Sequence, residues 1–404
     1  MKLPPAAGFQ ITSNPNVDRS NAILDTAECI APATSRQRAL QEIRSWPGYV
    51  PTPLIELNGP ARAVGIGKIW YKHEGARFGL DSFKPMGGGY AVSRIIARHV
   101  MRTVGVDEVT SSDLLSGKYR DITSGVTVTC ATDGNHGRAV AWAAQKFGCR
   151  AVVYMASLVS ELREQAIVSY GAEVVRSTGN HEQASEECWR AAERYGWYVV
   201  SETERATEPA IAHDTLSGYV ALLHELFEQL PSDFAPSHMF VQAGVGGLAA
   251  ASAIFMAERW GARRPVLVVV EAAVADCIRR SVAAGSPTVV TGELDTIMAG
   301  LAAGEVSTHA WSILERGADF VMTIGDDAAI ATMKLLIEAP LGDKAVVAGE
   351  SGVAGLAAAL AVAQDRSARE RLGLNGESRV VTIGTEGATD PAVYEQLVGR
   401  PPTM

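Results

Sequence analysis

A single lysine, Lys84, lies between Phe83 and three glycines in the stretch FGLDSFKPMGGGYA, residues 78–91. A desolvated lysine amine can act as a nucleophile or form a Schiff base with an aldehyde. The glycines at 87–89 carry no side chains, so a bulky group can approach the backbone there. An exposed lysine before a helix would have the same neighbours, so this stretch alone leaves both interpretations open.

A second motif, QAGVGGLAAA at 242–251, joins an apolar strand to an alanine-rich helix. Its turn consists of Gly244, Val245, Gly246, Gly247 and Leu248. The free amides of a helix N-terminus attract anions, so a phosphate fits this turn. A tight turn without a ligand is an alternative. A dinucleotide fingerprint is another, in which Ala249 replaces the last glycine.

The loop ATDGNHG at 131–137 connects a further strand to a further helix. Asp133 and Asn135 are residues that favour turns and helix caps, so a well-capped helix start is the simple explanation. The hydroxyl of Thr132, the side chain of His136 and the loop amides could instead bind a substrate carboxylate. The Asp133 carboxylate could transfer protons.

Three later motifs carry hydroxyls, acids and glycines. Thr385 follows directly after an apolar strand in SRVVTIGTEGATDP, residues 378–391, which places a neutral hydroxyl at the end of that strand. The stretches DTIMAGLAAGE (295–305) and GESGVAGL (349–356) are rich in glycine and alanine. Such stretches suit close packing around a flat ligand, although packing without chemistry is the commoner case.

The elements that position these motifs alternate between strand and helix. Short apolar runs at 125–131, 149–155, 172–177, 197–202, 238–243, 264–272 and 378–384 are expected as strands. Helical patterns separate them at 138–147, 158–171, 181–196 and 248–260. This alternation predicts an α/β protein with two doubly wound domains and mainly parallel sheets, which bind ligands at the carboxyl ends of their strands. The stretch 103–124 is expected as a loop or short helix, and 51–54 as an entry strand or turn.

Composition excludes several classes of protein. The formal net charge is −9 over 404 residues without a basic run of five, which argues against nucleic acid or a membrane as a partner. Nothing at the N-terminus indicates secretion, and the 5 cysteines never form a CxxC pair, so a cytoplasmic protein is expected. The 8 histidines show no ligand spacing, and no metal site is expected.

The motifs together suit pyridoxal 5′-phosphate (PLP), which requires an amine, an anion site and polar partners for its ring. Here the chain resembles the fold type II family of PLP enzymes, the tryptophan synthase β and threonine dehydratase group. The similarity runs from about residue 50 to 391. It is strongest to the ammonia-lyases of this family that act on 2,3-diaminopropionate. The resemblance implies a homodimer with a large domain at 1–95 and 206–404 and a small domain at 96–205.

The resemblance also implies roles for individual residues. Lys84 forms the Schiff base, Phe83 packs against the cofactor ring, and Asn135 contacts the 3′ oxygen. Residues 244–248 bind the phosphate, and Thr385 contacts the pyridine nitrogen. Most members have Ser or Thr where Asp133 stands, so the acid resembles the proton-abstracting aspartate of the ammonia-lyases. The substrate-binding residues are then Ser82, Thr132 and His136.

One departure concerns Glu202, which stands near the position of a second acidic base that is an aspartate in the family. Glu202 is longer by one methylene, and a displacement of about 1 Å can cost two orders of magnitude in rate. The expected reaction is α,β-elimination of D- or L-2,3-diaminopropionate to pyruvate and ammonia, with Lys84 or Glu202 serving the L-substrate and Asp133 the D-substrate.

Three alternatives stay open. One is a lyase or dehydratase of the same fold that acts on serine, threonine or a larger β-substituted amino acid. Another is a nicotinamide oxidoreductase in which Glu271 binds the ribose. The third is a non-catalytic sensor.

Overall fold

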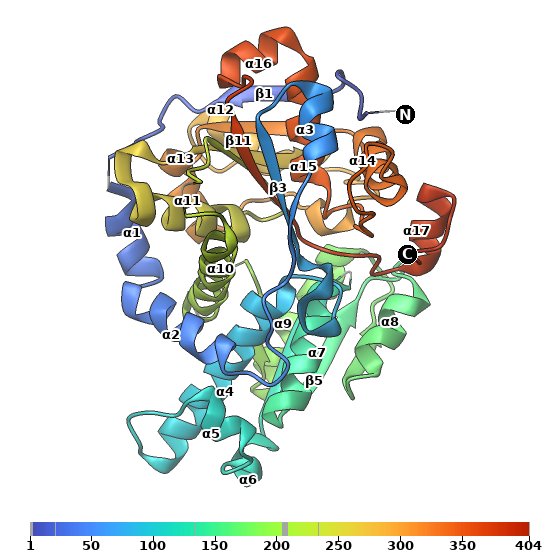
Figure 1. Cartoon of the computed structure of the whole chain (residues 1–404). Coiled ribbons are helices and arrows are strands. Elements are labelled where there is room, and N and C mark those ends of the chain that lie inside the picture. The colour runs from blue at the N-terminus through green and yellow to red at the C-terminus, as the bar shows by residue number, and fades with distance from the viewer. Residues whose placement is uncertain (1–2, 21, 133, 204–208, 233, 404) are drawn as a thin grey trace. The chain divides into compact units, whose positions relative to one another are not determined.

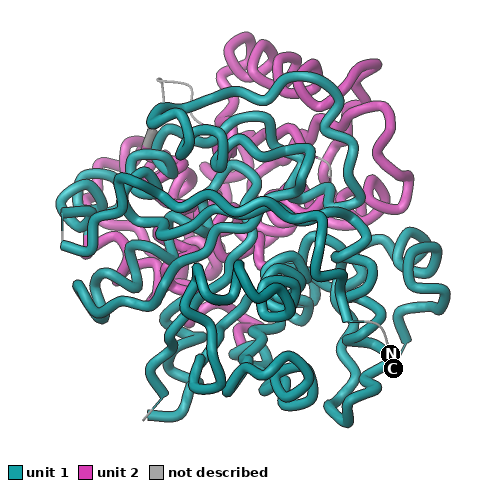
Figure 2. Tube along the Cα trace, turned by 90° about the horizontal axis from the view of Figure 1, so that it is seen from above, with its two compact units in different colours: residues 1–32, 51–82, 223–404 teal, residues 33–50, 83–222 magenta. Residues whose placement is uncertain are grey.

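The computed structural model describes residues 3–20, 22–132, 134–203, 209–232 and 234–403. This part of the chain separates into two compact units, which Figure 2 colours teal and magenta. The first unit holds residues 1–32, 51–82 and 223–404, and the second holds 33–50 and 83–222. These bounds assign 33–50, 83–95 and 206–222 differently from the predicted domains. The division into folding domains at 96 and 205 stays a prediction.

The first unit is built on a seven-stranded sheet with the order β1-β10-β9-β8-β11-β3-β2. Its parallel centre consists of β10 (Phe320–Ile324), β9 (Val266–Ala272), β8 (His238–Gln242), β11 (Arg379–Gly384) and β3 (Lys68–His73). The edge strands β1 (Gln10–Ser13) and β2 (Leu54–Glu56) pair antiparallel with β10 and β3. An antiparallel edge on a parallel sheet is common in doubly wound folds.

Helices cover both faces of this sheet. Phe240, Val268 and Met322 belong to one apolar core together with α14 (Asp326–Glu338) and α15 (Ala354–Gln364). Their strand neighbours, such as Val241 and Val269, are equally inaccessible to solvent. Successive strand side chains point to opposite faces, so the second face must be covered too. A second group of helices lies apart from α14 and α15 in Figure 1. It consists of α1 (Ala22–Ile30), α11 (Gly247–Trp260) and α13 (Thr308–Gly317).

Smaller helices complete the first unit. They are α3 (Asn58–Val64), η1 (Glu74–Gly79), η3 (Gly261–Arg263), α12 (Cys277–Ala284), η4 (Ala299–Leu301), α16 (Arg366–Leu372) and α17 (Pro391–Val398). Both this unit and the second one match the predicted class of doubly wound α/β domains with mainly parallel sheets.

The second unit contains a four-stranded, wholly parallel sheet with the order β6-β5-β4-β7. Its strands are β4 (Thr127–Thr132), β5 (Arg150–Met155), β6 (Glu173–Arg176) and β7 (Tyr198–Val199). Val152 and Tyr154 pack against α9 (His181–Tyr195), whereas Val153 faces α7 (Asn135–Phe147) near Gly137. Every strand of this sheet was expected from the sequence.

The remaining helices of this unit surround the sheet and the Lys84 stretch. They are α2 (Ala33–Arg44), η2 (Pro85–Gly89), α4 (Tyr90–Val104), α5 (Ser111–Leu115), α6 (Arg120–Thr123) and α8 (Glu161–Val168). The stretch 103–124 therefore contains the end of α4 and two short helices, as expected. The helix α10 (Pro209–Gln229) contributes residues to both units.

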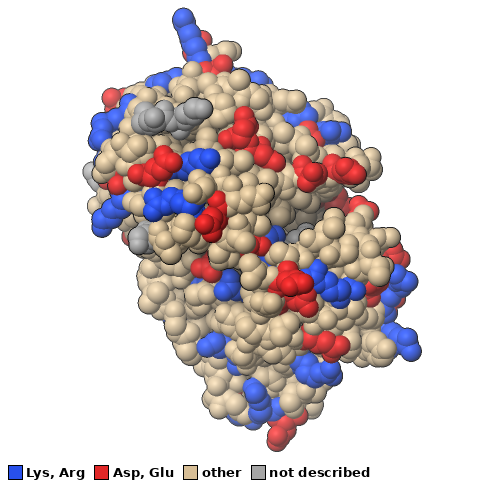
Figure 3. All heavy atoms as spheres, turned by 90° about the vertical axis from the view of Figure 1, so that its right-hand side faces the viewer, with Lys and Arg blue, Asp and Glu red and all other residues tan. Residues whose placement is uncertain are grey.

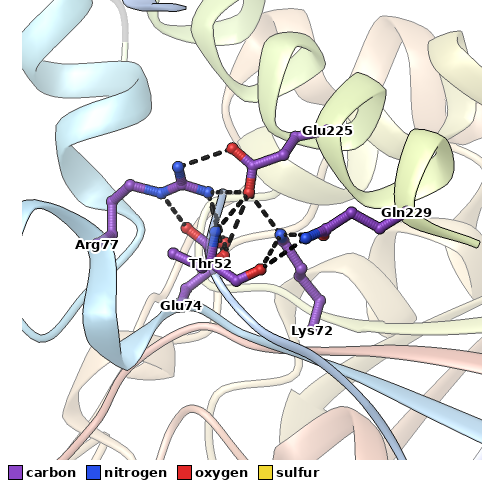
Figure 4. Close-up of polar contacts among 6 residues, drawn as sticks. All are labelled: Thr52, Lys72, Glu74, Arg77, Glu225 and Gln229. Atoms are coloured by element: carbon purple, nitrogen blue, oxygen red, sulfur yellow. Dashed lines mark hydrogen bonds and ion pairs between the residues drawn. The ribbon is translucent and has the colours of Figure 1, made fainter. Parts of the chain in front are cut away.

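A buried network of charged groups ties three segments of the first unit together (Figure 4). The guanidinium of Arg77 pairs with the carboxylates of Glu74, through Nε at 2.8 Å, and Glu225, through Nη2 at 2.7 Å. Lys72 donates to Glu225 at 2.5 Å and to the carbonyl oxygen of Thr52 at 2.8 Å. The network therefore connects the chain at Thr52, the end of β3 with η1, and the second half of α10. In sequence, η1 directly precedes the Lys84 stretch.

Positive and negative side chains are interspersed on the face of the molecule shown in Figure 3. Among the described helices, none is both long and apolar enough to cross a bilayer.

Candidate active site

Lys84 is the residue before the π-helical turn η2, which begins with Pro85. Its Nζ atom forms a short ion pair with Oε2 of Glu202 and lies 5.1 Å from the centroid of the Phe83 ring. The two charged side chains are 17% and 19% exposed, so the pair is largely shielded from solvent but still accessible. The structure therefore brings together two residues that the sequence predicted as catalytic and that lie 118 positions apart.

Tyr219 in α10 completes this arrangement and was not expected from the sequence. Its hydroxyl donates to Oε1 of Glu202, the carboxylate oxygen that Lys84 does not contact. The Tyr219 ring lies 4.9 Å from the Phe83 ring at an interplanar angle of 31°. Nothing in the local sequence marks this tyrosine, because it is an ordinary residue within a largely buried helix.

The three glycines after Lys84 make room for the protein's own rings. A Cβ atom on Gly87 would lie 2.5 Å from the Tyr219 ring. A Cβ on Gly88 would lie 3.2 Å from His136, and one on Gly89 would lie 3.3 Å from Trp142. The bulky groups that these glycines admit in this unit are therefore side chains that hold the Lys84 turn in place.

The electrostatics of the pair favour a charged Glu202. Burial alone would raise its pKa. The ammonium of Lys84 and the hydrogen bonds from Lys84 and Tyr219 outweigh burial and lower the pKa to about 2. Glu202 is thus a carboxylate at neutral pH, able to accept a proton. Burial also lowers the pKa of His136, which favours the neutral imidazole.

The loop before α7 is organised by Thr132. Its hydroxyl oxygen accepts hydrogen bonds from the amides of Gly134 at 3.0 Å and Gly137 at 3.1 Å. His136 contacts the carbonyl oxygen of Val200 through Nε2 at 2.7 Å, so Nε2 carries the proton. Its Nδ1 atom is then a bare acceptor, buried and without a partner among the described residues. Asn135 is the first residue of α7, and Asp133 lies outside the described residues.

The glycine turn after β8 belongs to the first unit. Gly246 adopts φ +100°, which only glycine reaches without strain, and α11 begins at Gly247. A Cβ on Gly244 would lie 3.0 Å from the Gly300 carbonyl oxygen, and one on Gly246 would lie 2.9 Å from Ala310. The turn is therefore a narrow, glycine-rich start to a helix, which suits an anion site.

The later motifs meet around the end of β11. Ser351 of GESGVAGL accepts a hydrogen bond from the Gly300 amide at 3.0 Å. The Ser351 amide in turn donates to Glu386 at 2.9 Å. Ser82 is buried and bridges to Glu386 through the backbone. These glycine-rich segments therefore pack on one another beside Thr385.

Gln242 is a second residue that the motifs did not single out. It is the last residue of β8, and its Nε2 atom lies 2.9 Å from the Thr385 hydroxyl oxygen. The signal was present in sequence only as a polar residue at the end of a buried strand.

Glu271 is placed differently from what a nicotinamide enzyme requires. Its carboxylate is fully buried and accepts the amides of Ile278 at 2.7 Å and Arg279 at 2.8 Å. Both oxygens therefore bond to the start of α12 in a fully buried position, which does not suit the binding of a ribose.

The described residues supply the chemical groups that PLP requires. The second unit holds a lysine amine paired with a carboxylate, and the first holds a glycine turn at a helix start and a buried strand-end hydroxyl. Among the described residues, no group of His, Cys, Asp and Glu could hold a metal ion. Two doubly wound sheets with these groups define the fold type II class of PLP enzymes.

Comparison with known proteins gives the same answer. A profile of the family described as "Pyridoxal-phosphate dependent enzyme" matches residues 46–386. The chain therefore belongs to the family of pyridoxal-phosphate-dependent enzymes, and its cofactor is PLP. This membership rules out the nicotinamide alternative.

Curated relatives are similar over most of their length. The chain is 36% identical over 355 residues to diaminopropionate ammonia-lyase of Escherichia coli K12, covering 87% of this chain and 88% of that protein. It is 33% identical over 360 residues to the enzyme of the same name from Salmonella typhimurium LT2, covering 87% and 89%.

Solved structures are similar as well. Holo diaminopropionate ammonia lyase from Escherichia coli superposes with a TM-score of 0.87 at 31% identity, covering 96% of both chains. The same enzyme in complex with an aminoacrylate-PLP azomethine reaction intermediate gives a TM-score of 0.86 over 98% of both chains. The complex of that enzyme with D-serine gives a TM-score of 0.87.

Proposed function

We propose that this protein is an ammonia-lyase that eliminates the β-amino group of 2,3-diaminopropionate, giving pyruvate and ammonia. The observation that carries the proposal is the Lys84–Glu202–Tyr219 arrangement, in a chain similar to diaminopropionate ammonia-lyases along nearly its whole length. The arrangement supplies an amine for the cofactor and a charged carboxylate beside it that can take a proton.

The cofactor-binding roles follow the family resemblance. Bound PLP would withdraw electrons from the α-carbon of the substrate. In the proposal, Lys84 binds its aldehyde carbon and Phe83 packs against its ring. Asn135 contacts the 3′ oxygen and Thr385 the ring nitrogen. The phosphate is held by Gly244, Val245, Gly246, Gly247 and Leu248.

Ser82, Thr132 and His136 are proposed to bind the substrate. Thr132 is suited to a carboxylate, because its oxygen already accepts two backbone amides and its hydroxyl hydrogen has no acceptor among the described residues. His136 offers its Nδ1 atom, which has no partner in the described part of the chain and can accept a hydrogen bond from an ammonium group.

Two residues are proposed as proton acceptors on opposite faces of the α-carbon. Glu202, together with Lys84, would take the proton from the L-substrate, and Asp133 from the D-substrate. The low pKa of Glu202 depends mainly on the Lys84 ammonium among the attractive charges. When Lys84 is no longer an ammonium, the pKa of Glu202 rises and the carboxylate becomes a stronger base.

A substrate panel tests the proposal. Purified protein with PLP is incubated with D- and L-2,3-diaminopropionate, both serines, threonine and bulkier β-substituted amino acids, and pyruvate or the corresponding keto acid is measured. We expect both diaminopropionates to be the best substrates. The β-hydroxy substrates represent a second candidate function, a dehydratase, favoured by the D-serine complex of a structural relative. Faster turnover of a serine or threonine would replace the first proposal with the second.

Two variants assign the residues. Lys84→Ala should abolish the visible absorbance of bound PLP, and retention of that band would contradict the role of Lys84. Asp133→Asn should suppress turnover of D-2,3-diaminopropionate while sparing the L-enantiomer. Equal losses for the two enantiomers would exclude the assignment of one acceptor to each face.

We further propose that the protein acts as a homodimer in the cytoplasm, in amino-acid catabolism. Light scattering of the purified protein should give twice the mass of one chain.

A further inference from the structure

Gln242 is a buried amide side chain, 3% exposed, at the end of β8. Its Nε2 atom lies 3.0 Å from the carbonyl oxygen of Gly352 and 2.9 Å from that of Ile383. The same atom lies 2.9 Å from Oγ1 of Thr385. One nitrogen is therefore surrounded by two carbonyl oxygens and one hydroxyl.

The two carbonyls determine which way the amide faces. A carbonyl oxygen can only accept a hydrogen bond, so the atom between Gly352 and Ile383 must be the amide nitrogen and not its oxygen. An amide nitrogen donates but does not accept. The two hydrogens of the amide are shared among these three oxygens, so the hydroxyl of Thr385 faces Gln242 with a lone pair and its hydrogen points in another direction.

The hydrogen of the Thr385 hydroxyl has no acceptor among the described residues. The structure shows Thr385 accepting from Gln242 but donating to no described atom, and the residue is only 5% exposed. Buried donors are nearly always paired, so this hydroxyl is suited to an acceptor on a bound ligand.

We propose that Gln242 is a positioning residue that orients the Thr385 hydroxyl as a hydrogen-bond donor to the pyridine nitrogen of PLP. The inference rests on the proposed function, in which Thr385 contacts that nitrogen. A nitrogen that accepts a hydrogen bond must keep its lone pair, so the ring nitrogen stays unprotonated. Gln242 thereby determines the ionisation state of a ring that it does not touch.

The experiment uses holoenzyme loaded with PLP that is labelled with ¹⁵N at the ring nitrogen. In the wild type, the ¹⁵N chemical shift should be that of an unprotonated, hydrogen-bonded pyridine. In Gln242→Met and in Thr385→Val, the shift should move to the value of a pyridine without a hydrogen bond. The dissociation constant of PLP should rise about five-fold in each variant, as expected for one ordinary hydrogen bond.

A double variant separates positioning from general structural damage. If Gln242 acts through Thr385, Gln242→Met should change neither the shift nor the PLP affinity further in the Thr385→Val background. Gln364→Met is the matched control, because Gln364 also donates to two backbone carbonyls, of Pro4 at 3.0 Å and Leu360 at 2.9 Å. It should leave both readouts unchanged.

Three results would overturn the inference. A protonated ring nitrogen in the wild type would make Thr385 an acceptor, and this result does not depend on any variant folding correctly. An unchanged ¹⁵N shift in Gln242→Met would contradict the role of Gln242 but not the proposed function. The same conclusion would follow if Gln242→Met changed the shift or the PLP affinity as much in the Thr385→Val background as in the wild type. Failure of wild-type Lys84 to take up PLP would instead overturn the proposed function and this inference with it.

Discussion

The Glu202 carboxylate is held by two different donors, one on each oxygen. Lys84 contacts Oε2 and Tyr219 contacts Oε1. The Tyr219 ring is in turn held between Phe83 and the side-chain-free backbone of Gly87. Tyr219 therefore orients the carboxylate independently of Lys84, and it continues to do so when the lysine nitrogen is engaged elsewhere.

At this scale we predict that Tyr219→Phe lowers kcat for L-2,3-diaminopropionate about tenfold, because a hydrogen bond to a charged group is lost. The visible absorbance of the bound cofactor should remain. The Tyr219 hydroxyl helps to lower the pKa of Glu202, so its removal should raise that pKa and shift the acid limb of the pH–rate profile to higher pH.

A matched control is Tyr394→Phe, which removes the hydroxyl of another buried tyrosine. Unchanged kcat and an unchanged acid limb in Tyr219→Phe would show that the hydroxyl does not orient Glu202.

At the scale of elements, the buried network around Arg77 joins segments that no local interaction would hold together. Thr52 and Glu225 are 173 positions apart, yet the Thr52 amide donates to the Glu225 carboxylate at 2.9 Å. Its two cations and two carboxylates all have partners within the network (Figure 4). A buried network in which every charge has a partner is stable, but removing one member leaves a buried charge uncompensated and lowers the free energy of unfolding.

We predict that Glu225→Gln lowers the free energy of unfolding by about 3 kcal/mol at pH 7, because Lys72 and Arg77 would share one buried carboxylate. Burial would raise the pKa of Glu225, but Arg77 and Lys72 lower it to about 2, from 4.5 in a free side chain. A lowered pKa stabilises the fold above pH 4.5, and this contribution is lost as the pH falls toward 2. The difference in the free energy of unfolding between wild type and variant should therefore decrease as the pH falls from 4.5 toward 2.

Denaturant unfolding at a series of pH values measures this difference. Glu56→Gln serves as control, because its ion pair with Lys68 is partly exposed and should contribute less than about 1 kcal/mol. If Glu225→Gln lowered the free energy of unfolding no more than Glu56→Gln does, the stabilising role of the network would be contradicted.

At the scale of the whole molecule, the cofactor links binding to stability. A ligand that binds only the native state stabilises it by about 2.7 kcal/mol at one hundred times its dissociation constant. We predict that PLP at this concentration raises the thermal unfolding temperature of the wild type, and that Lys84→Ala gains less at the same concentration. Calorimetry of both proteins with and without PLP measures the difference. If PLP left the thermal unfolding temperature of the wild type unchanged, the prediction would be contradicted.

Much of the architecture could be predicted from the sequence, because most central strands are buried on both faces. The runs MFV within β8 and VLVVV within β9 are apolar throughout, and the glycines and caps between the strands and helices mark the turns. The strands β3 and β10, the helices α1 and α2, and the edge strand β1 were not predicted, and of the edge strand β2 only Leu54 falls within the entry strand or turn expected at 51–54. An edge strand is only partly buried, so its apolar pattern is weak.

The chain alone was sufficient for the class and the cofactor, because motifs such as the Lys84 stretch and the glycine turn are contiguous and carry their chemistry locally. The partners that orient these groups follow only from folding. Tyr219 lies 17 residues from Glu202, and Gln242 lies 143 residues from Thr385. Hydrogen bonds act over about 3 Å, and only the packing of strands and helices decides which distant side chains come that close.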